Sequence, residues 1–160
     1  MTGIYLSLGS NIGERAENIA RTIAALAERG MHVLKTSSLY ETEPVEFLAQ
    51  DWFLNSVVEV QTKLSPGELM PALLSIERAM GRERVTPKGP RIIDMDILLY
   101  GSRVVRGVEL EIPHPRMTER RFVLVPLAEI AAGVVHPALK KTVAELLAET
   151  ADRSEVRLFL

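Results

Sequence analysis

The spacing of apolar residues divides the chain into short strands and helices. Alternating or continuous apolar runs predict strands at residues 4–8, 33–40, 53–62, 92–100, 104–105 and 156–160. Helical spacing predicts helices after residue 13 and over residues 66–80, 120–132 and 142–150. The main order is therefore β-α-β-β-α-β with a short helical tail. This order is typical of the ferredoxin-like α+β class, in which helices pack on a mainly antiparallel sheet.

Capping residues predict where two of these helices begin. Ser65 is followed by Pro66, which fits a first helical turn, and by Glu68 at the spacing of a capping box. Asn11 and Glu14 have the same spacing, so we expect the first helix to begin there with a second capping box.

Length and composition limit the kinds of protein that this chain can be. Its 160 residues fit one domain spanning 1–160, and 47% hydrophobic with 25% charged residues is typical of a folded globular protein. A net charge of −2 disfavours extended nucleic-acid binding. The absence of cysteine excludes disulfides, thiolate metal sites and cysteine nucleophiles. With no membrane-spanning run or targeting signal, we expect a cytoplasmic protein, and a monomer.

Two carboxylates interrupt an otherwise apolar strand. Asp94 and Asp96 alternate with Met95 and Ile97, so they project from one face with Cα atoms about 7 Å apart. Neighbouring carboxylates repel each other, and a divalent cation relieves that repulsion. Their oxygens suit Mg²⁺ completed by water and substrate phosphates, and two ions can share such a pair. For the Asp-x-Asp pattern alone, a solvated strand face is the better interpretation.

Arginines on both sides of this strand change that interpretation. They form two groups in the sequence, Arg82, Arg84 and Arg91 before the strand and Arg116, Arg120 and Arg121 after it. Guanidinium groups bind phosphate oxygens through two parallel hydrogen bonds. Each arginine alone is most simply a surface charge, but the set around a carboxylate pair indicates a polyphosphate site.

Three further features are ambiguous. His114 stands between two prolines and either donates to a phosphate or is a turn histidine without a role. Glu77 continues the row of Leu69 and Leu73 along a helix, and it is either a surface carboxylate or a polar group that faces the site. Residues 9–13 lack the Gly-Lys-Ser/Thr ending of a phosphate-binding loop, so we interpret them as a strand-to-helix turn.

A flat binding slot is indicated by Phe53 and Asn55, which share a strand face. A ring stacks on a planar heterocycle, and a carboxamide beside it forms hydrogen bonds to the heterocycle's edge. Phe122, which follows the second arginine group, can supply the opposite stacking face. The alternative is a core phenylalanine next to an asparagine that is already hydrogen-bonded.

Taken together, these residues resemble the 6-hydroxymethyl-7,8-dihydropterin pyrophosphokinase family over nearly the whole chain. The motifs that carry the resemblance are residues 8–11, 39–42, 53–55, 76–77, 89–98, 112–117 and 121–124. The family has a ferredoxin-like fold. The resemblance implies an ATP- and Mg²⁺-dependent diphosphokinase of folate biosynthesis. It would transfer pyrophosphate from ATP to the hydroxymethyl dihydropterin, giving AMP and the pterin diphosphate.

The resemblance also implies a role for each site residue. Asp94 and Asp96 would hold two Mg²⁺ ions and would form the catalytic group with Arg82 and Arg91. The residues expected to bind ATP are Glu77, Arg82, Arg84, Arg91, Ile97, His114 and Arg120. The residues expected to bind the pterin are Thr42, Glu43, Val45, Phe53, Asn55 and Phe122.

Two other functions fit parts of this pattern. Another Mg²⁺-dependent nucleotidyl-transfer enzyme on a ferredoxin-like fold would use the same carboxylate geometry, although it has no need of a pterin slot. A single-stranded RNA-binding module would need aromatic residues on the sheet surface, and aromatic residues are only 5% of this chain.

Overall fold

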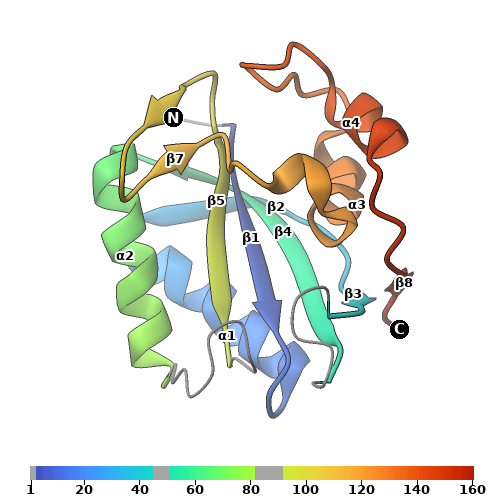
Figure 1. The fold of residues 1–160 in the computed structure, drawn as a ribbon. Helices are drawn as coiled ribbons and strands as arrows, with labels where there is room; N and C mark the ends of the chain where they lie inside the picture. Colours follow the sequence, from blue (N-terminus) through green and yellow to red (C-terminus); the bar gives the residue numbers. More distant parts are fainter. Residues whose placement is uncertain (1–2, 45–50, 82–91) are drawn as a thin grey trace.

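The computed structural model describes residues 3–44, 51–81 and 92–160 (Figure 1). The strands of its main sheet are β1 (Ile4–Ser10), β2 (Met31–Thr36), β3 (Tyr40–Thr42), β4 (Phe53–Thr62), β5 (Asp94–Tyr100) and β8 (Val156–Leu158). The helices are α1 (Arg15–Glu28), α2 (Pro66–Ala79), α3 (Arg121–Ala131) and α4 (Val143–Glu149). A small hairpin of β6 (Val105–Arg106) and β7 (Glu111–Ile112) and a short 3₁₀ helix (Met117–Glu119) precede α3.

The strand order confirms the predicted fold class. The main sheet has the order β5-β1-β4-β3-β8, and β2 also pairs with β4. All of these pairs are antiparallel. Helix α1 lies between β1 and β2 in the chain, and α2 lies between β4 and β5. This is the split β-α-β arrangement of ferredoxin-like folds, extended by the two short strands β3 and β8.

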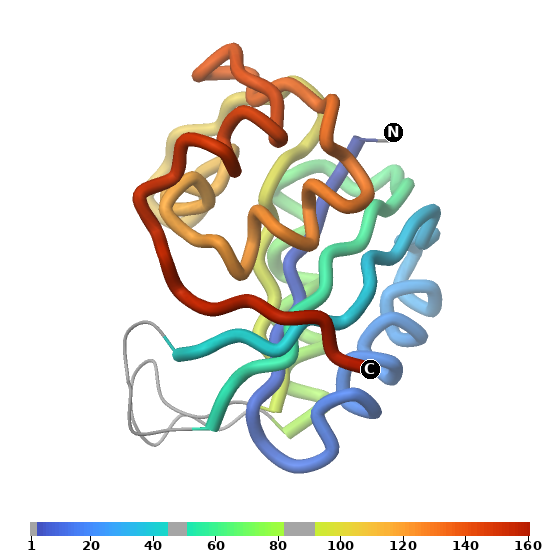
Figure 2. The backbone as a smooth tube through the Cα atoms, turned by 90° about the vertical axis from the view of Figure 1, so that its right-hand side faces the viewer, coloured from blue at the N-terminus to red at the C-terminus, as the bar shows by residue number. Residues whose placement is uncertain are grey.

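Helices cover both faces of the sheet, so the chain has two cores (Figures 1 and 2). On one face, Leu6 and Leu8 of β1 pack with residues of α1 and α2 such as Ile19 and Leu73. On the other face, Tyr5 and Val57 pack with residues of α3 and α4; these include Val123, Leu127 and Val143. This division follows from the strand alternation, because neighbouring residues of β1 point to opposite faces.

The predicted start of α2 is confirmed. Ser65 accepts a hydrogen bond from the Glu68 amide, and the Glu68 side chain accepts one from the Ser65 amide, which completes the capping box. Thr142 and Glu145 form the same arrangement at α4. Among the helices of the described ranges, none is both long enough and apolar enough to cross a membrane.

Two local predictions were wrong. Helix α1 begins at Arg15 with Glu14 as its N-cap residue, so Asn11 lies too early in the chain to form the expected capping box, and no side chain caps this helix. The Asn11 Nδ2 donates to the carbonyl oxygen of Asp51 at 3.1 Å. The strand predicted over residues 33–40 is divided into β2 and β3. Ser37 lies in the break, and its hydroxyl oxygen accepts a hydrogen bond from the Val57 amide at 2.9 Å, so a side chain occupies a place in the ladder.

Candidate active site

Asp94 and Asp96 lie on the face of the sheet that α3 covers. In the β1–β5 pair, Asp94 is opposite Gly9 and Asp96 is opposite Ser7. Directly opposite residues of an antiparallel pair share a face. Both aspartates are half-buried. The predicted side-by-side arrangement of these carboxylates is therefore confirmed.

A row of residues connects the aspartates to the proposed slot. Across three strands the register places Asp94 opposite Gly9, and Gly9 opposite Asn55. Strands are about 4.8 Å apart, so Asp94 and Asn55 are separated by about 10 Å, with only a glycine between them. A Cβ atom on Gly9 would lie 2.8 Å from Asn55 Oδ1 and 3.6 Å from the Phe53 ring. The missing side chain at position 9 therefore keeps the space between the two groups open.

Asn55 is fixed in one orientation by its neighbour on β3. Its Nδ2 donates to Thr42 Oγ1 at 2.6 Å, and both side chains are buried. Oδ1 lies on the side of Gly9, where a Cβ atom at position 9 would come within 2.8 Å of it. Phe53 is half-buried and lies opposite Thr42 in the β3–β4 pair. The Nδ2 of Asn55 is therefore hydrogen-bonded within the protein, and its Oδ1 faces the site.

His114 is held beside the carboxylate pair by its own backbone. Its amide donates to the carbonyl oxygen of Leu98 on β5 at 3.0 Å, and its Nδ1 accepts from the Arg116 amide at 3.1 Å. Its Nε2 lies 3.8 Å from Asp96 Oδ1. With Nδ1 acting as an acceptor, a neutral ring carries its proton on Nε2, the nitrogen that faces the carboxylates.

The surroundings of His114 keep its ring neutral. Burial, followed by the positive charges of Arg120 and Arg116, lowers its pKa to about 4, and the negative charge of Asp94 opposes this shift. These causes also show which charged groups lie near the ring. The predicted residues Arg116, Arg120 and Asp94 therefore lie near His114, and its role at a phosphate stays a prediction.

Arg120 and Phe122 form the start of α3. Arg120 is the N-cap residue, and its guanidinium carbon lies 5.5 Å from the centre of the Phe122 ring. Phe122 is half-buried and contacts the core between the sheet and α3. Helix α3 covers the face that carries Asn55 and the aspartates, so both residues belong to the same side of the sheet.

Glu77 is a buried residue of α2, with only 2% of its surface exposed. Its Oε2 accepts a hydrogen bond from the Met95 amide at 2.8 Å. The interpretation as a surface carboxylate is therefore wrong. Because Met95 stands between Asp94 and Asp96, Glu77 holds the backbone that carries both carboxylates.

The side chains of two predicted site residues are occupied within the protein, and four other predicted site residues lie outside the described ranges. Ile97 is buried in the core on the α1 and α2 side, so only its backbone is available to a ligand. Glu43 lies at the end of β3 and bonds to the backbone of Glu155. The residues that fall outside the described ranges are Val45, Arg82, Arg84 and Arg91.

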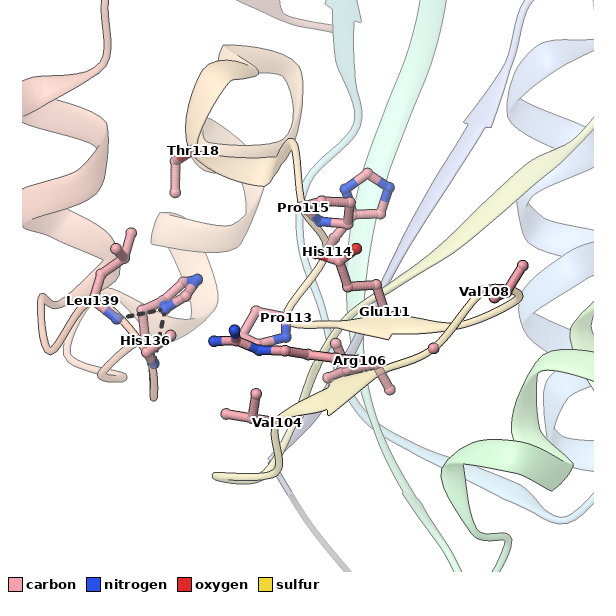
Figure 3. A pocket seen from close by; sticks show the side chains of 13 residues that line it. Val104, Arg106, Val108, Glu111, Pro113, His114, Pro115, Thr118, His136 and Leu139 are labelled. Carbon is pink, nitrogen blue, oxygen red and sulfur yellow. Dashed lines mark hydrogen bonds between the residues drawn. The ribbon is translucent and has the colours of Figure 1, made fainter.

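A pocket of about 570 Å³ lies next to the His114 loop, between the β6–β7 hairpin and the segment that follows α3 (Figure 3). Arg106 extends toward His136 across this pocket, and the His114 ring lies on the far side of Pro113 (Figure 3). His136 Nδ1 accepts hydrogen bonds from the amides of Ala138 and Leu139 at 3.2 and 3.1 Å. Of the predicted site residues that the structure describes, His114 alone lines this pocket.

The carboxylate pair is the candidate metal site. Within the described ranges, no group of three or more histidine, aspartate or glutamate residues is placed to hold a metal ion. Asp94 and Asp96 offer two carboxylates. This donor set suits Mg²⁺, which is usually bound through one or two carboxylates, with water and substrate phosphates as its other ligands.

Sequence reasoning missed the role of Gly9 and the partner of Glu77. Gly9 was predicted to lie in the turn after the first strand, but β1 continues to Ser10, so Gly9 is a strand residue. A glycine at this position in a strand often marks the close approach of another group. No sequence signal predicts that Glu77 reaches the Met95 amide, because this contact depends on how α2 packs against β5.

Comparison with known proteins identifies the family. Residues 5–132 match the family model for 7,8-dihydro-6-hydroxymethylpterin-pyrophosphokinase. The 2-amino-4-hydroxy-6-hydroxymethyldihydropteridine pyrophosphokinase of Methylorubrum extorquens is 46% identical over 150 residues, which cover 93% of this chain and 94% of that protein. The protein of the same name from Bacillus subtilis is 46% identical over 131 residues, covering 81% of this chain and 78% of that protein.

Other relatives are much longer. The folic acid synthesis protein fol1 of Pneumocystis carinii is 44% identical over 149 residues, which are 93% of this chain but 20% of that protein. The chain therefore spans about a fifth of the length of this relative and of two similar ones.

A solved structure supports the fold. The wild-type HPPK-DHPS of Plasmodium falciparum, solved with pterin and p-hydroxybenzoate, has a TM-score of 0.73 at 20% identity. It covers 93% of this chain, which spans 42% of that structure. The chain belongs to the 7,8-dihydro-6-hydroxymethylpterin-pyrophosphokinase family.

Proposed function

We propose that this chain transfers the pyrophosphoryl group of ATP to the hydroxymethyl oxygen of 6-hydroxymethyl-7,8-dihydropterin, releasing AMP. The observation that carries the proposal is the row Asp94–Gly9–Asn55 across the sheet. It places a carboxylate pair suited to phosphate chemistry beside a carboxamide and an aromatic ring suited to a flat heterocycle. The membership of the chain in the pyrophosphokinase family supports the same reaction.

The phosphate end of the site is built on β5. Asp94 and Asp96 would hold Mg²⁺, two ions by resemblance to the family, and the metal would neutralise charge on the transferred phosphates. His114 faces the same space with a proton on Nε2, and it donates that proton in a hydrogen bond to a phosphate oxygen. The ring is neutral at pH 7 because its pKa is lowered to about 4, so it donates without titrating.

Arginines complete the phosphate end. Arg120 stands at the start of α3, close enough to lower the pKa of His114. We assign Arg82, Arg84 and Arg91 to the phosphates from the family resemblance, and their positions lie outside the described residues. Glu77 acts on this end through the Met95 amide, which orients the two aspartates.

The acceptor end is built on β3, β4 and α3. The Nδ2 of Asn55 donates to Thr42, and this hydrogen bond orients the carboxamide with its acceptor Oδ1 on the side of Gly9. A pterin presents N–H donors along its 2-amino and N3 edge, which is the complement that a carbonyl oxygen requires. Phe53 and Phe122 stack on the two faces of the ring. Backbone groups at Thr42, Glu43 and Val45 extend this recognition.

The reaction is a displacement at the β-phosphorus of ATP. The hydroxymethyl oxygen forms a bond to that phosphorus and loses its proton, while the bond from the β-phosphorus to the oxygen bridging to the α-phosphorus breaks. AMP leaves with that oxygen. Positioning and charge neutralisation account for most of the catalysis of phosphoryl transfer, so the proposal does not depend on a dedicated general base.

The proposal is tested by following each phosphorus of ATP separately. The protein is incubated with Mg²⁺, the hydroxymethyl dihydropterin and ATP labelled at the α, the β or the γ position. We expect the β and γ labels in the pterin product in equal amounts, and the α label in AMP. Transfer of the γ label alone indicates a simple kinase, and transfer of the α-phosphorus indicates the nucleotidyl-transfer alternative; either result overturns the proposal.

A further inference from the structure

Residues 152–159, which we call the strap, connect the two sides of the proposed pterin slot. Figure 2 shows this last segment, in red, leaving the α3 and α4 side and running beside β3. The strap lies outside the residues 5–132 that the family model matches. We propose that the strap sets the spacing of the pterin slot, with Arg157 as its main positioning residue. This inference rests on the proposed function.

One end of the strap holds the α3 side. Asp152 Oδ2 accepts a hydrogen bond from the Arg121 amide at 2.8 Å, and the Ser154 carbonyl oxygen accepts one from Arg121 Nε at 3.1 Å. Arg121 is the first residue of α3 and precedes Phe122. The strap therefore fixes the turn of helix that carries one stacking ring.

The middle of the strap holds β3. Glu155 donates its amide to Glu43 Oε1 at 2.7 Å, and its carbonyl oxygen accepts from the Glu43 amide at 3.2 Å. Val156 is paired with Thr42. Thr42 in turn receives the hydrogen bond that orients Asn55. A strand of three residues has few contacts of its own, so its position depends on its two neighbours, β4 and β8.

Arg157 joins the strap to the residue that precedes Phe53. Its Nε and Nη2 donate to Glu41 Oε1 at 3.1 and 2.9 Å, and its guanidinium carbon lies 4.5 Å from the centre of the Trp52 ring. Such a contact combines two charge-assisted hydrogen bonds with stacking on an aromatic face. It holds Trp52 against β3 at the point where β4 begins.

Arg15, the first residue of α1, contacts the same two residues. Its Nη1 donates to the Trp52 carbonyl oxygen at 2.8 Å, and its Nη2 donates to Glu41 Oε2 at 3.0 Å. Glu41 thus bridges two arginines, and the hydrogen bonds from Arg157 lower its pKa more than those from Arg15. The network Arg15–Glu41–Arg157–Trp52 is a closed ring of contacts on the face of the sheet that α1 covers, behind the strands whose other face carries the slot.

The consequence is that a single segment contacts the residues next to both stacking rings. It bonds to Arg121 beside Phe122, and it stacks on Trp52 beside Phe53. Stacking on both faces of a heterocycle requires the two rings to stay at a fixed spacing. Loosening the strap should therefore weaken pterin binding while leaving the phosphate end on β5 unchanged.

The test compares Arg157→Ala with Arg153→Ala, each measured for pterin and nucleotide affinity. Arg153 belongs to the same strap, but its hydrogen bonds go to the carbonyl oxygens of Thr150 and Asp152, and they leave β3 and Trp52 untouched. Binding of 6-hydroxymethylpterin is followed by fluorescence, with and without Mg²⁺ and a non-hydrolysable ATP analogue. Binding of the analogue is followed by calorimetry.

We expect Arg157→Ala to weaken pterin binding about fivefold, with nucleotide affinity unchanged. This factor corresponds to losing the binding free energy of an exposed ion pair together with a cation–π contact. Arg157→Lys should restore part of the loss, because it keeps the charge without the planar fork. Equal pterin affinities in Arg157→Ala and Arg153→Ala overturn the inference. So does a parallel loss of both affinities, which indicates general destabilisation. A wild-type protein that fails to bind pterin at all overturns the proposed function itself.

Discussion

Glu77 Oε2 accepts a 2.8 Å hydrogen bond from the amide of Met95, the residue between Asp94 and Asp96. Strand β5 is at the edge of the sheet, so β1 offers ladder partners on one side only. A buried carboxylate from α2 supplies an acceptor for the β5 backbone, and the two aspartates are thereby held in register with β1.

Replacing Glu77 should therefore lower the stability of the protein. Glu77→Ala leaves the Met95 amide without this acceptor, so we expect the free energy of unfolding to fall by about 1–3 kcal/mol. Glu77→Gln keeps an acceptor oxygen and should lose much less. Urea unfolding of both variants provides the measurement. Equal stabilities of the two variants would show that the Met95 contact contributes nothing.

The aspartate pair should be needed for chemistry and not for folding. Asp96→Ala removes a metal-binding carboxylate, so we expect turnover to fall by at least on the order of 10²-fold. Thermal stability should be unchanged or higher, because two half-buried carboxylates no longer repel each other. Glu28→Ala, which removes an exposed carboxylate at the end of α1, is the control. Activity that disappears only together with the folded circular dichroism spectrum would contradict the metal role.

Gly9 should be essential for pterin binding. In Gly9→Ala the new methyl group meets Asn55 Oδ1 at 2.8 Å, so the carboxamide must move from the position set by Thr42. We expect pterin affinity to fall by about tenfold, the effect of about 1.4 kcal/mol, with nucleotide affinity preserved. In the control Gly67→Ala, the added methyl group meets no atom within 4 Å. Unchanged pterin titrations for Gly9→Ala would show that the row across the sheet is not the binding surface.

His136 should make the protein sensitive to acid. Its Nδ1 accepts hydrogen bonds from two backbone amides, and burial lowers the pKa of the ring. The folded state therefore favours the neutral ring. The unfolded chain then binds the extra proton first, and stability is complete above the ordinary histidine pKa of about 6.5 and falls as the pH drops below it. His136→Gln, which does not titrate, should lose less stability between pH 7 and pH 5. Parallel pH profiles of unfolding would contradict this.

Local sequence signals were sufficient for much of the fold. The range of β4 was predicted residue for residue from its five apolar and five polar residues, the pattern of a half-buried strand. The start of α2 followed from Ser65 and Glu68, whose capping contacts are three residues apart. The shared face of Asp94 and Asp96 followed from the strand period alone.

Contacts between distant parts of the chain were not predictable in this way. Asn11 has the spacing of a helix cap, but its Nδ2 donates a hydrogen bond to the carbonyl oxygen of Asp51, 40 residues away. The partner of Glu77 and the strap contacts of Arg157 likewise join residues that only the tertiary packing brings together. Sequence reasoning identified the chemical groups of the site, and long-range packing determines how each group is held.

The central claim is tested most directly by the nucleotide that the protein releases. The wild-type protein is incubated with ATP and Mg²⁺, with and without 6-hydroxymethyl-7,8-dihydropterin, and the nucleotides are separated by ion-exchange chromatography. We predict AMP only when the pterin is present, in an amount equal to the pterin diphosphate formed. ADP as the nucleotide product, or AMP and free pyrophosphate released at the same rate without the pterin, would contradict pyrophosphoryl transfer to this acceptor.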